Sequence, residues 1–404
     1  MATAEQARER LVADLVRDGR VRSPRVRAAM EAVPRHLFLP GLDPAAAYAD
    51  EAVPIKTDGG VTVSSVSQPS MVAIMLEQLE AAPGHRVLEI GAGAGWNAGL
   101  LAHVVGPDGA VITVDIDDDL VEGTRKNLAA AGLERVTAVT ADGAGGYPAG
   151  APYDRIELTV GATAIRPEWV AQLVPDGRLL LPLTVRGSQL SIAFTHTGPG
   201  LLTSTSVRSC AFVRLRGAGA DPGRDTVLPG GGWTVQPACR DVAEGDAGLE
   251  VLERALHEPG RDRDAPVPGS VSDLWDGLGL WCALADPRVV RLLGPDGGCL
   301  ARSLFGLAGV RAGLGLVTED GCALLVADPP ATIRSFGPGG DGAADRLAAL
   351  AAGWVRAGRP HAADLRVDAV VPELADDPPP VPDGGREIVD GAGTRLRIAW
   401  GTGP

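Results

Sequence analysis

A glycine-rich segment at residues 89–95, EIGAGAG, is the first part of the sequence whose residue types and spacing suggest chemistry. It follows a short apolar run and precedes a helical pattern. Glycines at alternate positions let the backbone turn sharply and approach a bound molecule without a clash from Cβ. Glu89, two residues ahead of the first glycine, adds a hydrogen-bond acceptor at the same place. The segment therefore predicts a loop that contacts a small ligand.

The spacing of these glycines separates two kinds of cofactor. A dinucleotide loop has its third glycine three residues after the second, but position 96 is Trp. The tighter spacing of Gly91, Gly93 and Gly95, with an acid ahead of it, is instead typical of a loop that binds S-adenosylmethionine (SAM). A glycine-rich loop alone is weak evidence for a particular cofactor, so the following strands have to support this interpretation.

Acidic residues end the next two predicted strands. Asp115 ends the run AVITVD and could accept hydrogen bonds from both ribose hydroxyls of a nucleoside. Asp142 follows the third strand and could accept from an adenine amino group. Each acid alone could also be a helix cap or a turn residue, but together with the glycines they favour a SAM pocket. The other expected cofactor contacts flank these residues: Ala92, Ile116, Gly143 and Thr159.

The elements that must position these residues alternate between strand and helix from Arg86 onward. Alternation of this kind predicts right-handed crossovers and a parallel sheet. After Leu190 only strand patterns follow, which predicts an antiparallel end to the sheet. We therefore expect an α/β fold of the Rossmann-like class I SAM methyltransferase type, with helices on both faces. The strand runs are RVLEI, AVITVDI, RVTAVT, YDRIELTV and GRLLLPL, and the helical stretches between them include 96–105 and 119–131.

The flanking regions are less regular. Residues 5–31 show helical spacing, a loop is expected from about 40 to 66, and Pro69 opens a further helix because proline suits the first helical position. A Gly/Pro-rich linker at 217–232 is expected to divide a domain over 1–216 from an α+β domain over 233–404. Predicted elements of the second domain are helices near 246–257, 270–284 and 342–357, a hairpin turning at Asp320-Gly321, and a hairpin joining REIV to TRLRIAW.

Composition excludes several classes of function. The formal net charge of −14 argues against nucleic acid and anionic membranes as partners. The five cysteines are widely spaced, which predicts neither a metal site nor a disulfide framework. The N-terminus is charged where a signal peptide would be apolar, and no apolar run approaches ~18 residues, so we expect a cytoplasmic protein. The cysteines are Cys210, Cys239, Cys282, Cys299 and Cys322.

Three segments resemble the protein-L-isoaspartate O-methyltransferases, over roughly residues 5–216. They are VPRHLF at 33–38, Ala47-Tyr48, and SVSQPSMVA at 65–73, and AFVRL at 211–215 resembles the closing strand of that family. In that family a Thr-x-Ser-x-Pro loop opens the helix ahead of the glycine motif. The resemblance implies SAM-dependent methylation of an Asp or isoAsp carboxylate, with Ser65 and Ser67 as catalytic residues. A hydroxyl at position 67 could instead only cap the helix.

Several residues have two interpretations. Lys56, Val66, Gln68 and Trp96 are expected substrate contacts, yet Lys56 could be an ordinary surface lysine and Trp96 a core residue. His36 is expected to be packed under the sheet. Glu157 departs from the family, which usually carries an apolar residue there; a carboxylate inside a parallel sheet is costly unless paired, so it should lie near a strand end or an Arg.

The sequence is compatible with three functions. The repair enzymes of the family end near position 216, and the extended chain resembles homologues associated with lanthipeptide and graspetide biosynthesis. The resemblance therefore implies, first, methylation of one Asp in a cyclised precursor peptide, which drives aspartimide formation. The alternative is a general repair methyltransferase, and a third possibility is a cofactor-binding accessory module. The five tryptophans after residue 232 could form a peptide-binding surface or fill a core.

Overall fold

A computed structural model describes residues 3–221, 225–229, 232–238, 246–265, 270–296, 300–307, 309–327, 331–375, 386–389 and 393–401. The chain forms two compact units. The first contains residues 1–183, 189–221 and 366–399, and the second contains 184–188, 222–365 and 400–404. The expected second domain at 233–404 is therefore not continuous, because its C-terminal segment returns to the first unit.

The first unit is built on one mixed sheet with the strand order β19-β20-β18-β9-β8-β7-β6-β3-β4-β5. Its central strands, β3 to β7, pair in parallel, whereas β8 (Ser188–Gly198) and β9 (Leu201–Ser209) pair antiparallel. The predicted parallel sheet with an antiparallel end is confirmed. The parallel strands are β3 (Arg86–Ile90), β4 (Ala110–Asp115), β5 (Thr137–Thr140), β6 (Tyr153–Leu158) and β7 (Leu173–Val185).

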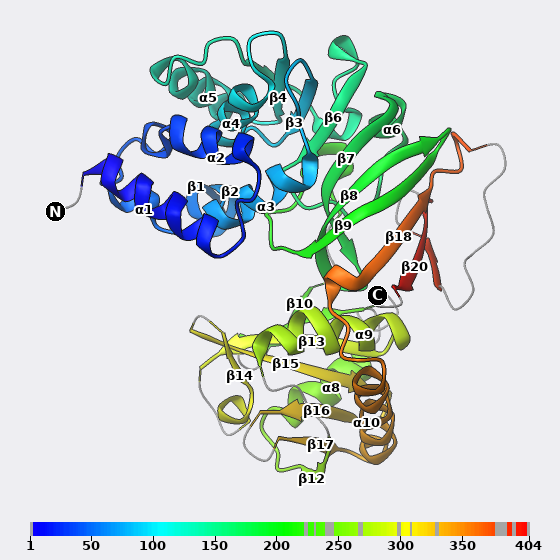
Figure 1. The fold of residues 1–404 in the computed structure, drawn as a ribbon. Coiled ribbons are helices and arrows are strands. Elements are labelled where there is room, and N and C mark those ends of the chain that lie inside the picture. The colour runs from blue at the N-terminus through cyan, green and yellow to red at the C-terminus, as the bar shows by residue number, and fades with distance from the viewer. Residues whose placement is uncertain are drawn as a thin grey trace. The chain divides into compact units, whose positions relative to one another are not determined.

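The C-terminal segment extends the antiparallel end of this sheet. Strand β18 (Leu365–Val370) pairs with β9, and the chain then forms the predicted hairpin of β19 (Arg386–Val389) and β20 (Arg395–Trp400). Figure 1 shows these orange and red strands beside the green strands β8 and β9. Thr394 donates to the carbonyl of Ile165 at 2.9 Å, which joins the returning segment to the chain more than 200 residues earlier.

Two helices form where the sequence predicted one. α1 (Ala4–Arg17) ends before Gly19, whose φ of +68° stops the helix, and α2 (Pro24–Ala32) begins after Ser23, whose side chain accepts from the amide of Val26. The other predicted helices of this unit are confirmed. They are α3 (Pro69–Leu79), α4 (Trp96–Val105) and α5 (Asp118–Ala130), followed by a short α6 (Pro167–Ala171).

A β-hairpin replaces the second half of the loop expected at 40–66. Strands β1 (Val53–Asp58) and β2 (Val61–Val66) pair antiparallel around Gly59 and Gly60, both of which have positive φ, as a tight hairpin turn requires. Because β2 leads directly to Pro69 and α3, this hairpin fixes the position of the serines at 65 and 67. Before it lie the short 3-10 helices η1 (Arg35–Phe38) and η2 (Ala46–Tyr48).

His36 and Tyr48 join these two short helices, because the Nδ1 atom of His36 lies 2.8 Å from the hydroxyl of Tyr48. The remaining 3-10 turns of the described chain are η3 (Gly143–Gly145), η4 (Pro148–Gly150), η5 (Gly217–Gly219), η7 (Ala301–Ser303) and η8 (Ala362–Asp364).

The second unit is an antiparallel sheet with the order β10-β11-β13-β15-β16-β17-β12, to which β14 adds beside β15. Successive residues of β16 belong to different cores. Leu325 is in one core with Leu347 of α10, and Leu324 is in another with Leu252 of α8. Helices therefore cover both faces, and the expected α+β organisation and the hairpin at Asp320-Gly321 are confirmed. The elements are β10 (Thr226–Val227), β11 (Thr234–Pro237), α8 (Asp246–Ala255), β12 (Arg261–Asp264), a π-helical turn (Asp273–Leu278), α9 (Gly279–Ala285), β13 (Val289–Pro295), β14 (Phe305–Leu307), β15 (Val310–Val317), β16 (Cys322–Val326), β17 (Thr332–Phe336) and α10 (Gly340–Arg356).

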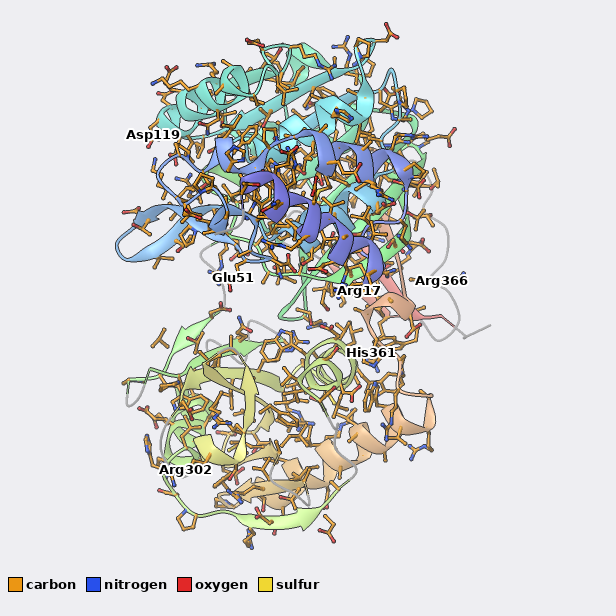
Figure 2. The ribbon with its side chains drawn as sticks, turned by 60° about the vertical axis from the view of Figure 1, so that its left-hand side comes forward. Arg17, Glu51, Asp119, Arg302, His361 and Arg366 are labelled. Carbon is orange, nitrogen blue, oxygen red and sulfur yellow. The ribbon has the colours of Figure 1, made fainter. Side chains whose placement is uncertain are left out.

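Two of the five later tryptophans, Trp233 and Trp354, are buried in the cores of the second unit. Charged side chains such as Arg17 and Asp119 in the first unit and Arg302 in the second lie on the surface (Figure 2). None of the described helices is both long enough and apolar enough to cross a membrane. Within the described residues the cysteines Cys210, Cys282 and Cys322 are free thiols, and Cys239 and Cys299 lie outside them.

Candidate active site

A pocket in the first unit is lined by the glycine loop, the end of β4 and the bend between β2 and α3. Most of the residues expected from the sequence lie in this pocket. They are Ser65, Val66, Ser67, Glu89, Gly91, Ala92, Gly93, Gly95, Trp96, Asp115, Ile116, Gly143 and Thr159. Three expected residues are not among those that line it in the described structure: Lys56, Gln68 and Asp142.

The glycine loop has the backbone conformation that its sequence predicts. Gly91, Gly93 and Gly95 have φ values of +106°, +54° and +90°, a region that residues with a Cβ rarely adopt. A Cβ at Gly91 would lie 2.7 Å from the hydroxyl oxygen of Thr159, and that hydroxyl donates to the carbonyl of Gly91 at 2.7 Å. The loop therefore fits tightly against Thr159, which directly follows β6, and its three glycines line the pocket.

Asp115 lies at the end of β4 with 9% of its surface exposed. One carboxylate oxygen accepts from the amide of Gly93 at 3.1 Å and the other from the amide of Asp117 at 3.3 Å. Burial raises the pKa of this carboxyl above its ordinary value. Each oxygen can accept a second hydrogen bond, so the geometry fits the expected contact with ribose hydroxyls.

Asp142 holds two backbone segments within the described structure. Its Oδ1 atom accepts from the amide of Ala144 at 2.9 Å and its Oδ2 atom from the amide of Ala218 at 2.7 Å. The carboxylate thus caps η3 and holds the turn at 217–219 instead of lining the pocket. Its neighbour Gly143 does line the pocket.

The bend that carries Ser67 is held in place by a buried arginine. The guanidinium of Arg35 donates to the carbonyl of Ser67 at 3.2 Å, and its Cζ lies 5.1 Å from the ring centre of Trp96. Burial lowers the pKa of Arg35 to about 10, so it remains charged at neutral pH. The resemblance included Arg35 but assigned it no role. Its other acceptors are the carbonyls of Ala47, Ala49, Glu51 and Val66.

The N-terminus of α3 is less open than expected. The amide of Ser70 donates to Asp50 Oδ1 at 2.8 Å, and Gln68 donates from Nε2 to Asp50 Oδ2 at 3.2 Å. Because Pro69 has no N–H, Asp50 already occupies the first free donor of the helix. Gln68 is therefore a partner of Asp50, and the hydroxyl of Ser67 remains the polar group that this bend offers to the pocket.

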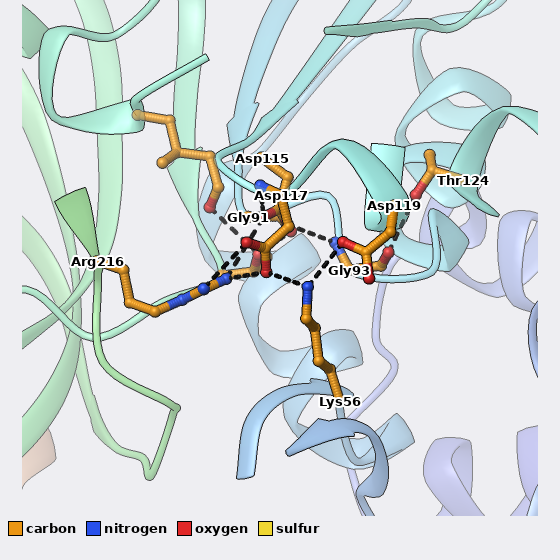
Figure 3. Close-up of polar contacts among 10 residues, drawn as sticks. Lys56, Gly91, Gly93, Asp115, Asp117, Asp119, Thr124 and Arg216 are labelled. Atoms are coloured by element: carbon orange, nitrogen blue, oxygen red, sulfur yellow. Dashed lines mark hydrogen bonds and ion pairs between the residues drawn. The ribbon is translucent and has the colours of Figure 1, made fainter. Parts of the chain in front are cut away.

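Lys56 is part of an ion-pair cluster at the rim of the pocket (Figure 3). Its Nζ atom lies 3.0 Å from Asp117 Oδ2 and 2.7 Å from Asp119 Oδ1, while Arg216 donates to both oxygens of Asp117 at 2.5 and 3.1 Å. Hydrogen bonds from Arg216 and Lys56 lower the pKa of Asp117. The cluster ties β1 to the segment 212–216, so Lys56 is a paired residue and is not free to attract an acidic peptide.

Segment 212–216 lines the pocket, although no pattern in the sequence indicated this role. It was expected to be part of a closing strand, but β9 ends at Ser209 and only an isolated bridge joins Arg214 to Gly161. Its backbone is held beside Gly161, which accepts from the amide of Leu215 at 2.8 Å and donates to the carbonyl of Val213 at 2.7 Å, and the segment forms one wall of the pocket.

Two buried carboxyls, Glu89 and Glu157, stand side by side on β3 and β6. The side-chain Nδ2 atom of Asn97 donates to both, at 2.8 Å to Glu89 and 3.0 Å to Glu157, and the hydroxyl of Thr113 donates to Glu89. Burial raises the pKa of Glu89 to about 8 and that of Glu157 to about 7. Glu157 lies near the end of its strand, which is one of the two surroundings expected for it, and the side chain beside it is another acid.

The comparisons agree with this geometry. The family model for protein-L-isoaspartate(D-aspartate) O-methyltransferase matches residues 5–219. A protein-L-isoaspartate O-methyltransferase of Methanopyrus kandleri is 43% identical over 213 residues, which cover 52% of this chain and 92% of that protein. A protein-L-isoaspartate O-methyltransferase of Hyperthermus butylicus is 41% identical over 220 residues, which cover 52% of this chain and 89% of that protein.

A solved structure bearing the name protein-L-isoaspartate O-methyltransferase has a TM-score of 0.52 and 23% identity, and the match covers 91% of this chain and 98% of that one. At this identity the likeness shows the fold alone, but it extends over both units. The match of more than half of the chain to one family model, together with the relatives above, shows that the chain belongs to the protein-L-isoaspartate(D-aspartate) O-methyltransferase family of class I SAM-dependent enzymes.

Proposed function

We propose that this chain transfers a methyl group from SAM to the isoaspartyl carboxylate of proteins and peptides. The observation that carries the proposal is that the bend with Ser65 and Ser67 and the loop with Gly91 and Gly93 line the same pocket. One wall therefore suits a carboxylate and the opposite wall suits a nucleoside, which is the arrangement that a methyl transfer between them needs.

The residues present fit SAM. Gly91 approaches Thr159 so closely that a Cβ would clash, and the loop of Gly91, Gly93 and Gly95 lines the pocket. Asp115 presents a carboxylate with unused acceptor capacity at the end of β4. When bound, SAM supplies a methyl group on a sulfonium, which a carboxylate oxygen can take while the C–S electron pair stays on sulfur.

The chemistry asks little of the protein beyond alignment. A carboxylate with a reference pKa of about 4 is ionised at pH 7, so no general base is needed and no proton moves during the transfer. The chain's own groups have to orient the carboxylate and remove part of its water. We assign this role to the hydroxyls of Ser67 and Ser65, with Arg35 holding the bend in position through the carbonyl of Ser67.

The fate of the ester follows from its chemistry. Esterification removes the negative charge that makes a carboxylate resist nucleophilic attack, so a neighbouring backbone nitrogen can close a succinimide ring on the methylated carbonyl. The methoxy group and the proton of that nitrogen leave together as methanol. Hydrolysis of the ring then gives Asp or isoAsp without further help from the enzyme. The same sequence on an Asp side chain would produce an aspartimide, so this chemistry is compatible with both repair and peptide maturation.

The presence of the second unit is not, by itself, evidence for a role in peptide maturation. A protein named as an isoaspartyl methyltransferase has the same two-unit fold over 91% of this chain, so an extension beyond position 216 also occurs under that name. The expectation that such enzymes end near 216 was therefore too narrow. We favour isoaspartyl sites as the substrate class, and methylation of a cyclised precursor peptide remains the competing outcome of the test.

Three peptides would test the proposal with radiolabelled SAM: an isoAsp hexapeptide, its Asp isomer and a constrained cyclic Asp peptide. We expect methylation of the isoAsp peptide and not of the linear Asp isomer. Methylation of the cyclic peptide alone would replace the proposal with peptide maturation. Ser67→Ala should lower the rate roughly 10- to 100-fold, whereas Thr203→Ala, which changes an exposed residue of β9, should leave it unchanged. Equal rates in both variants would remove Ser67 from the mechanism.

A further inference from the structure

One buried carboxyl oxygen in the pocket has no role in the chemistry above. Glu157 is fully buried and lines the pocket. Its Oε2 atom accepts from Asn97 at 3.0 Å, whereas its Oε1 atom has no hydrogen-bond partner within the described part of the chain. Buried polar atoms are almost always paired in native proteins. An unpaired oxygen in a pocket wall therefore indicates a position that a bound group fills.

The surroundings of Glu157 select the charge of that group. Glu157 has Glu89 of β3 beside it. The other polar groups around these two carboxyls are Asn97 at the start of α4, and Thr113 and Asp115 on β4. Of these, Glu89 and Asp115 are acidic, and neither Glu89 nor Glu157 forms an ion pair with any residue that the structure describes. Asp115 has a cation at 3.9 Å in Arg216, so the unmatched acids are Glu89 and Glu157. Two buried acids without an ion-pair partner favour a ligand that brings a positive charge and N–H donors.

The sheet order places this acid at the right distance from the nucleoside contact. β3 lies between β4 and β6, so the ends of β4 and β6 are two strand spacings apart, about 10 Å. Asp115 ends β4, and Glu157 is the last residue but one of β6. A ligand whose ribose contacts Asp115 and which crosses the glycine loop therefore reaches Glu157 with its other end. In SAM, that end carries a primary ammonium group.

We propose that Glu157, together with Glu89, binds the primary ammonium group of the cofactor and releases a proton when it does so. This inference rests on the proposed use of SAM. Raised pKa values mean that the pair holds a proton near neutral pH when no cation is present. An ammonium group would donate to the unpaired Oε1 atom and favour the ionised form, so the proton leaves.

Two ligands without a sulfonium separate this role from general cofactor binding. S-adenosylhomocysteine carries the ammonium group, whereas methylthioadenosine shares the adenosine and thioether but has no amino-acid end. We expect Glu157→Gln to weaken S-adenosylhomocysteine roughly tenfold or more in titration calorimetry and to leave methylthioadenosine within about twofold. A matched control is Glu134→Gln, an exposed exchange outside the pocket, which should change neither affinity.

Proton release is measured by titrating the wild type near pH 7 in two buffers with different ionisation enthalpies. We expect release of a fraction of a proton with S-adenosylhomocysteine, none with methylthioadenosine, and a smaller release with S-adenosylhomocysteine in Glu157→Gln, where Glu89 is the remaining buried carboxyl. Binding of S-adenosylhomocysteine without proton release, or an unchanged ratio of the two affinities in the variant, would overturn this inference alone. Failure of the wild type to bind either ligand would overturn the proposed function as well.

Discussion

Replacing Glu157 with Gln should make the ligand-free protein more stable in alkaline solution. The side chain is fully buried, and burial raises its pKa from 4.5 to about 7. In the unfolded chain the same carboxyl ionises near its ordinary value. The folded protein therefore holds a proton that the unfolded chain has already lost, and its free energy of unfolding falls as the pH rises between these two values.

The size of this effect follows from the shift in pKa. A shift of this size corresponds to about 3 kcal/mol of unfolding free energy, which is fully present below about pH 4.5 and lost by about pH 7. The amide side chain introduced by Glu157→Gln would keep an acceptor for Asn97 and would have no charge to bury. The exchange should therefore be close to neutral at pH 5 and stabilising by about 3 kcal/mol at pH 8.5. Because the charge of Glu157 also raises the pKa of Glu89, the variant should lower that pKa as well.

Urea unfolding of the ligand-free wild type and variant, followed by tryptophan fluorescence at several pH values between 5 and 8.5, would measure the difference. The pH profile of the wild type alone is insufficient, because burial lowers the pKa of His36 and His85. The contribution of these two residues to the free energy of unfolding therefore increases as the pH rises through the same range. Glu134→Gln supplies the control, with a difference from wild type that does not change with pH. If the free energy of unfolding depended on pH in the same way for the wild type and Glu157→Gln, the reasoning would be refuted. Such a result would mean that the pKa of Glu157 does not differ between the folded and unfolded states.

Three further predictions concern the residues that hold the pocket. Arg35→Met should lower the free energy of unfolding by about 2–4 kcal/mol in urea, because several carbonyls lose a buried charged donor; a loss below about 1 kcal/mol would contradict this. Lys56→Met should speed dissociation of S-adenosylhomocysteine about two- to fivefold in stopped-flow measurements at low salt, because Asp117 loses one of its two cations at the pocket rim. Lys126→Met, which removes the only other lysine, should have no such effect, and the Lys56 effect should disappear in about 1 M NaCl. Asp50→Ala should lower thermal stability by about 1 kcal/mol because α3 loses its cap, with no change in affinity for S-adenosylhomocysteine; tighter or weaker binding would show that the cap also shapes the pocket.

The parts of the site that could be predicted from the sequence are those whose conformation depends on a few neighbouring residues. The loop with Gly91, Gly93 and Gly95 needs positive φ at each glycine, and this requirement is visible in the residue types themselves. Asp115 could be placed because it ends an apolar run, and parallel strands end at one edge of the sheet. In each case the structural cause lies within a few residues of the position.

The parts that could not be predicted depend on contacts between distant segments. Asp50 caps α3 from twenty residues away, and Asp142 has its second partner at Ala218, so neither role leaves a local pattern. The same holds for the return of β18 to β9, because a strand pattern predicts a strand but not the neighbour with which it pairs. Arg35 was visible as part of a motif, but its function depends on carbonyls from two later segments of the chain, 47–51 and 66–67.

Glu157 is the position where local and global requirements conflict, and the conflict itself is informative. An arginine partner or a bound proton could relieve the cost of a buried carboxyl on an inner strand. The neighbour is another acid, so the free protein depends on the proton, and this solution leaves the Oε1 atom unpaired. An ammonium ligand would remove both defects at once. The exchange to Gln should then have opposite effects on two quantities: greater stability of the free protein at alkaline pH, and weaker binding of ligands that carry an amino group. A residue kept only for packing would change stability and leave the preference between the two ligands untouched.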